Sequence, residues 1–66
     1  MQELFNISKE VVGMGEPEAI RFVEESDFLY QIEQRDGEKC DIMDGFRDDR
    51  VTMTIKEGVV TGAIIY

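Results

Sequence analysis

The segment RVTMTIK, residues 50–56, constrains the fold more than any other stretch because its side chains alternate in character. Val51, Met53 and Ile55 are apolar, and the residues between them are polar. A period of two residues indicates a half-buried β-strand, with one face toward a core and the other toward solvent. Gly58 follows, and the β-forming run VVTGAIIY comes directly after it. We therefore predict a second strand that pairs with the first through a hairpin.

Two further elements precede this hairpin. The run FLYQIEQ alternates Tyr30 and Ile32 with polar residues, which predicts another half-buried strand, closed by the turn residues Asp36-Gly37. Before it, the run EPEAIRFVEES places apolar side chains on one helical face, with Pro17 in the first turn, where its missing N–H is harmless. We predict a helix over about residues 16–26. The first ten residues are expected to form only a helical turn.

This order of elements predicts an α+β fold, with one helix packed on a small mixed β-sheet. All 66 residues are expected to form a single domain, residues 1–66, near the size at which one core is only marginally sufficient. The connection between the first two main strands is the unusual part. It runs from about residue 36 to 48, which is long for a hairpin, so we expect a long exposed loop with a function.

The composition disfavours several classes of function. The chain has no histidine and one cysteine, Cys40, which excludes ordinary zinc sites, histidine-based catalysis and an intramolecular disulfide. We therefore expect no enzyme, no cofactor and no metal site. The net charge of −8 argues against nucleic acid and anionic membranes as partners. Because no basic segment followed by an apolar run opens the chain, we expect no signal peptide and a soluble, cytoplasmic protein.

The segment DIMDGFRDDRV, residues 41–51, contains Arg47 and Arg50 among four aspartates. Taken alone, these arginines are expected to pair with neighbouring carboxylates on the surface, where each pair contributes about 0–1 kcal/mol. A calcium site is not expected, because the carboxylates lack the order of an EF-hand loop.

Three motifs then occur in a set order across residues 11–66. The run VVG, with its Val-Gly dipeptide, leads into the predicted helix. RDG precedes the long loop, and FRDDRV runs from the loop into the next strand. This combination resembles the potato inhibitor I family of serine protease inhibitors, especially its short bacterial relatives. The resemblance implies a substrate-like loop that lies in the cleft of a serine protease and is cut and released slowly. It also implies that Arg47 and Arg50 support the loop by hydrogen bonds.

The resemblance places the reactive loop at about residues 41–46, and an ungapped alignment puts the scissile bond between Asp44 and Gly45. Two positions depart from the family, which usually has an apolar residue before this bond and an acidic one after it. A shift by one residue would put Met43 in the enzyme's pocket and Asp44 in the arginine-bonding role, with Gly45 as an extra residue. Both registers remain open. The residues of the expected reactive loop are Ile42, Met43, Asp44, Gly45 and Phe46.

The leading hypothesis is therefore an inhibitor of a serine protease, which would be subtilisin-like, chymotrypsin-like or specific for acidic residues. The alternative is a non-inhibitory module that keeps the scaffold and binds another protein through its acidic loop, with an affinity that falls steeply as salt is added. The final run GAIIY is strongly β-forming and would pair with another chain if it lay at a sheet edge. We expect a monomer or a weak homo-oligomer.

Overall fold

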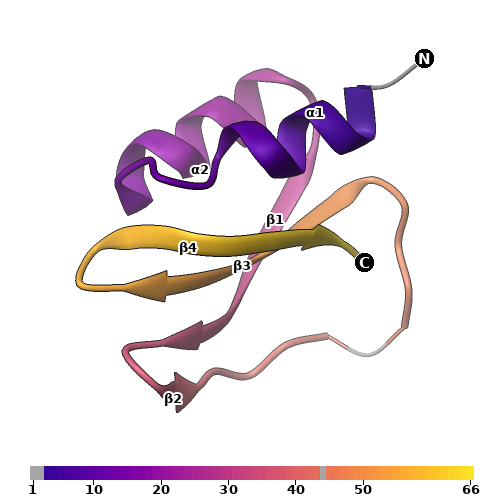
Figure 1. Cartoon of the computed structure of the whole chain (residues 1–66). Coiled ribbons are helices and arrows are strands. Elements are labelled where there is room, and N and C mark those ends of the chain that lie inside the picture. The colour runs from indigo at the N-terminus through magenta and orange to yellow at the C-terminus, as the bar shows by residue number, and fades with distance from the viewer. Residues whose placement is uncertain (1–2, 44) are drawn as a thin grey trace.

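The computed structural model describes residues 3–43 and 45–66. Two helices come first in the chain and are followed by four strands, which form one sheet in the order β2-β1-β3-β4. Figure 1 shows both helices on the same side of this sheet. The elements are α1 (Glu3–Glu10), α2 (Glu16–Glu25), β1 (Leu29–Arg35), β2 (Glu38–Lys39), β3 (Arg50–Lys56) and β4 (Val59–Ile65).

The central strands β1 and β3 are parallel, while β2 pairs with β1 and β4 pairs with β3 in antiparallel fashion. The expected α+β fold with a mixed sheet is thus confirmed. Because β1 and β3 run in the same direction, the chain must return from one end of the sheet to the other before β3 begins. It does so through the turn at Asp36-Gly37, the short strand β2 and the segment 40–49, which we call the loop. Strand β2 was not predicted.

Helix α2 matches the predicted helix. It begins after the N-cap Gly15, with Pro17 in its first turn and two glutamates near the positive end of the helix dipole. The single helical turn expected in the first ten residues is instead a complete helix, α1. Ile7 and Val11 lie about one turn apart, and both are buried in the core. Burial of this apolar stripe supplies the stability that so short a helix lacks on its own.

The core lies between the helices and the sheet, and β3 runs through its centre. Val51, Met53 and Ile55 are at most 1% exposed, as the alternation predicted. The polar face of β3 differs from the prediction, because Arg50 and Thr52 are also buried, at 3% and 1% exposed. The other buried apolar residues are Ile7, Val11, Ala19, Val23 and Val60.

Strand β4 lies at the edge of the sheet, and the segment before α2 covers the first part of it. The N–H of Gly13 donates to the main-chain oxygen of Val60 (2.8 Å), and the N–H of Val60 donates to that of Met14 (2.9 Å). Further along the strand, Ile64 is 54% exposed. Self-association through this strand, one of the alternatives that the sequence left open, stays a prediction.

Candidate functional site

The loop presents apolar side chains to solvent. Met43 is 72% exposed, Phe46 71% and Ile42 39%. Asp44, which the sequence places among the reactive residues, lies outside the described residues. Exposed apolar side chains gathered on one segment are typical of a surface that contacts another molecule. The loop is therefore a candidate binding segment.

Arg50 connects the loop to the sheet. It is the first residue of β3, and its Nη2 donates to the main-chain oxygens of Gly45 (2.8 Å) and Tyr66 (2.7 Å). Its Nε is buried and has no hydrogen-bond partner among the residues that the structure describes. A charged donor shared by two carbonyls makes a strong and directional contact. Arg50 thus fixes the position of Gly45 relative to β3.

Arg47 is placed differently from Arg50. Its Nε and Nη2 donate to the two carboxylate oxygens of Asp49, at 2.8 Å each, so its guanidinium is engaged outside residues 41–46. The hydrogen bond and the attraction of Asp49 raise the pKa of Arg47, and the same hydrogen bond is the main cause that lowers the pKa of Asp49. The side chains of the pair are about half exposed, where such a pair contributes little stability.

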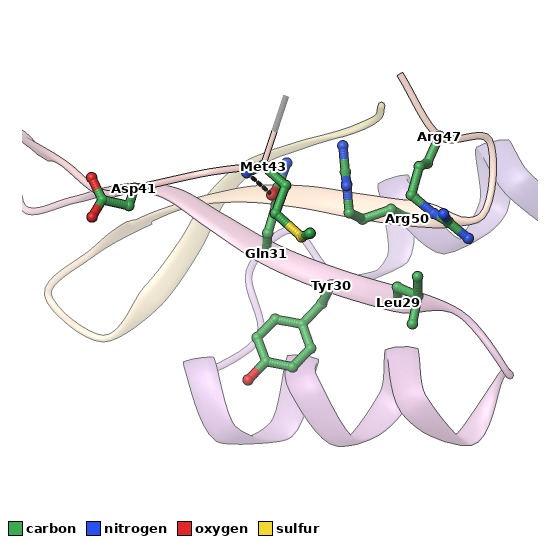
Figure 2. A pocket seen from close by; sticks show the side chains of 7 residues that line it. All are labelled: Leu29, Tyr30, Gln31, Asp41, Met43, Arg47 and Arg50. Carbon is green, nitrogen blue, oxygen red and sulfur yellow. Dashed lines mark hydrogen bonds between the residues drawn. The ribbon is translucent and has the colours of Figure 1, made fainter. Parts of the chain in front are cut away.

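Gln31 contacts the loop as well, although the sequence reasoning did not single it out. Its Oε1 accepts a hydrogen bond from the N–H of Met43 (3.2 Å), and its Nε2 donates to Oγ1 of Thr52 (3.0 Å). Figure 2 shows the bond to Met43 as a dashed line. The available signal was the alternation in β1, which puts Gln31 on the face away from the helices, directly opposite Thr52 in the sheet.

A groove separates the loop from β1. Figure 2 shows the side chain of Met43 bending from the loop toward β1, with Leu29 and Tyr30 beyond it. Although solvent reaches most of Met43, its side chain and its N–H are thus both turned toward the scaffold. The groove is lined by Leu29, Tyr30, Gln31, Asp41, Met43, Arg47 and Arg50.

Tyr66, which follows β4, joins the base of the loop to the sheet. Its main-chain oxygen accepts hydrogen bonds from Arg50 and from the N–H of Arg47 (3.0 Å). Its hydroxyl donates to Oε1 of Glu33, whose Oε2 accepts from Thr54 (3.3 Å). The hydrogen bond to Glu33 raises the pKa of Tyr66, with removal from water as the second cause. This chain of contacts fixes the acceptor that both arginine residues share.

Gly45 adopts a conformation that other residues rarely adopt. Its φ is +94°, and a Cβ built at this position would have no atom within 4 Å. Glycine is therefore favoured here by the backbone angle and not by lack of space. The carbonyl that Arg50 contacts is thus presented by a bend in the loop and not by a fully extended segment.

A metal site and a membrane-spanning helix find no support in the parts of the chain that the structure describes. No group of three or more cysteine, aspartate or glutamate side chains there is arranged to hold a metal ion, and none of the described helices is long and apolar enough to cross a membrane. Cys40, the first residue of the loop, is a free thiol. Comparison with protein-family models, curated proteins and solved structures finds no significant match to the chain. The function is therefore inferred from the motifs of the sequence and from the geometry of the molecule itself.

Proposed function

We propose that the protein is an inhibitor of the potato inhibitor I type, which blocks a serine protease by inserting residues 41–46 into its cleft. One observation carries the proposal. The loop is tied to the sheet by hydrogen bonds on Met43 and Gly45, while its apolar side chains stay exposed. A segment that is both held in place and exposed is suited to binding with little loss of conformational freedom.

Inhibition requires that the enzyme binds the loop firmly and releases it slowly. Preorganisation supports firm binding, because the entropy of ordering the loop is lost when the inhibitor folds and not when it meets the enzyme. Slow release requires that a loop cut by the enzyme keeps its shape. Hydrogen bonds from two different strands, through Gln31 of β1 and Arg50 of β3, supply such a restraint without a disulfide.

The side chain that enters the enzyme must point away from the inhibitor's own sheet. Met43 lies in the groove against β1, and its N–H is taken by Gln31. The ungapped register, in which Asp44 precedes the scissile bond, leaves these contacts in place. We therefore favour Asp44 as the specificity residue and a serine protease that accepts acidic side chains as the target.

A titration of active protease with increasing inhibitor tests the proposal. The panel contains subtilisin, chymotrypsin, elastase and a glutamate-specific serine protease, and Asp44→Met is run beside the wild type. Wild type is expected to inhibit the glutamate-specific enzyme, and Asp44→Met is expected to move inhibition to chymotrypsin or subtilisin. Inhibition of chymotrypsin or subtilisin by wild type would assign the pocket to Met43 instead. If neither folded protein inhibits any enzyme, the proposal fails.

The conformation of Gly45 favours a second candidate, a binding module that does not inhibit. A substrate-like strand needs extended backbone on both sides of the scissile bond, and the φ of +94° at Gly45 departs from this shape. The partner would then be another protein that meets an acidic loop. Its affinity is expected to fall steeply as salt rises from about 50 to about 500 mM, because added salt screens the attraction between charges. A captured partner whose affinity ignores salt would exclude this version.

A further inference from the structure

The two hydrogen bonds that hold the loop act on opposite sides of Asp44. Gln31 accepts from the N–H of Met43, and Arg50 donates to the main-chain oxygen of Gly45. A cut of the bond between residues 43 and 44, or of the bond between residues 44 and 45, would leave one of these contacts on each new end. Each new end therefore keeps one hydrogen bond in either register of the scissile bond.

A hydrogen bond to Thr52 fixes the orientation of the Gln31 side-chain amide. The register of the parallel strands sets the two residues side by side, and Thr52 is only 1% exposed. The Nε2 of Gln31 donates to the Thr52 hydroxyl, so the opposite end of the amide, Oε1, is turned toward Met43. An amide whose two ends have different partners has one preferred orientation. Thr52 thus orients Gln31, and Gln31 holds Met43.

We propose that Gln31, oriented by Thr52, is a positioning residue that keeps the acyl side of a cut loop in place, while Arg50 keeps the amine side. This inference rests on the proposed inhibitory function. Its consequence is that the cut loop is returned to the intact form more often than it is lost by hydrolysis.

The chemical step requires no further reactant. When the protease serine attacks, its oxygen forms an ester with the loop carbonyl, and the amine of the next residue leaves with a proton. In the reverse step that amine attacks the ester carbon, the peptide bond forms again, and the serine oxygen regains a proton. Water competes with the amine for the same ester. An amine that Arg50 holds near an acyl group that Gln31 holds competes at a high effective concentration.

The first test uses the inhibitor without any protease. Exchange of the Met43 amide proton with water is measured by NMR for wild type, Gln31→Ala, Gln31→Glu and Thr52→Val. Gln31→Ala is expected to speed exchange about three- to tenfold, which corresponds to loss of one hydrogen bond. Gln31→Glu keeps an acceptor for the amide and is expected to stay near wild type, since the Thr52 hydroxyl can rotate to donate to it. Thr52→Val is expected to fall between the two.

A glutamine elsewhere on β1 supplies the matched control. Gln34 is also partly buried, and it lines a different surface depression near the turn at Asp36-Gly37. Gln34→Ala is expected to leave exchange at Met43 unchanged. If Gln31→Ala folds and exchanges at the wild-type rate, or if Gln34→Ala has the same effect as Gln31→Ala, Gln31 does not hold Met43 and the inference is overturned.

The second test uses the protease that wild type inhibits. The rate of loop cleavage and the final ratio of cut to intact inhibitor are measured by mass spectrometry. Gln31→Ala is expected to be cut about tenfold faster and to end further toward the cut form, in line with the loss of preorganisation, while Gln31→Glu restores the wild-type values. The association rate is expected to stay unchanged, which separates positioning from recognition.

The outcomes of the two tests separate the inference from the proposed function. If wild type inhibits and Gln31→Ala is cut no faster, the role of Gln31 in religation is refuted while the inhibitory function stands. If wild type inhibits no enzyme, the proposed function and the religation role both fail. The amide exchange then still decides whether Gln31 holds the loop.

Discussion

The two faces of the sheet are built in different ways, although one strand serves both. On the face toward the helices, β3 contributes Val51, Met53 and Ile55, which are buried by apolar contact. On the opposite face, the same strand contributes Arg50 and Thr52, which are just as buried but lie in a network of hydrogen bonds. The helix face is held by apolar area and the loop face by directional contacts.

This difference means that the stability of the fold and the position of the loop depend on different faces of the sheet. Apolar burial is roughly proportional to area and tolerates changes that preserve volume. Hydrogen bonds weaken steeply when their geometry is lost, so they fix where a segment lies. Changes on the helix face should therefore alter the free energy of unfolding most, and changes on the loop face should alter the conformation of the loop most.

The largest expected effect lies on the helix face. Met53 is fully buried, so Met53→Ala is expected to lower the free energy of unfolding by about 2–5 kcal/mol, through lost burial and the cavity that remains. Met53→Leu preserves most of the volume and is expected to cost less than about 1.5 kcal/mol. Urea unfolding measures both. A loss from Met53→Ala no larger than that from Met53→Leu would contradict the packing described here.

Arg47, within the loop, and Arg50, which begins β3, provide the next comparison. Arg50→Ala removes the donor of the Gly45 oxygen and one of the two donors of the Tyr66 oxygen, which keeps the N–H of Arg47, and is expected to cost about 1–3 kcal/mol. Arg47→Ala breaks only an exposed pair with Asp49 and is expected to cost about 0–1 kcal/mol. Urea unfolding measures the stability, and loop cleavage by a protease measures the positioning. Equal effects from the two substitutions would show that the loop does not depend on Arg50.

A smaller effect is expected at Gly45. Because its φ is +94° and the space around it is open, Gly45→Ala introduces only backbone strain, expected to be about 1 kcal/mol. Gly62 in β4 also has open space but no positive φ, so Gly62→Ala is the matched control and is expected to be neutral or stabilising. Urea unfolding of the two variants tests this, and a neutral Gly45→Ala would contradict the positive φ described for this bend.

The smallest expected effect is a loss of stability at alkaline pH. Because the pKa of Tyr66 is raised in the folded protein, its contribution to stability is fully present below the ordinary tyrosine value of about 10 and is lost as the pH rises through the higher folded value. Absorbance titration in a Tyr30→Phe background measures the pKa of Tyr66. Glu33→Gln is expected to lower that pKa, because the charged acceptor is removed. An unchanged pKa would rule out the contact with Glu33.

Much of the helix face was predictable from the sequence because it depends on local pattern. The alternation in residues 50–56 identified β3 and its inward side chains, and the position of Pro17 identified the start of α2. Helix α1 was underestimated, since its stability comes from contact with β4 and not from its own residues.

The loop face was harder to predict because it depends on the path of the chain between β1 and β3. Thr52 was expected to face solvent, and the parallel pairing with Gln31 instead places it behind the loop. The motif FRDDRV drew attention to two arginines, but the side chain of Arg47 reaches Asp49 and not the described residues of 41–46. No residue pattern showed that Gln31 would be within reach of Met43, because that distance is set by long-range contacts.

Because β1 and β3 pair in parallel, closing the chain between them is a step in folding. Leu29 pairs with Arg50, so the chain between them must close before the centre of the sheet can form. Closure entropy rises slowly with length, by about 0.6 kcal/mol for each doubling, so residues could be added at the exposed tip without great loss of stability. Folding would slow modestly as the contacts become more distant in sequence. The scaffold is therefore suited to carrying loops of different lengths and sequences.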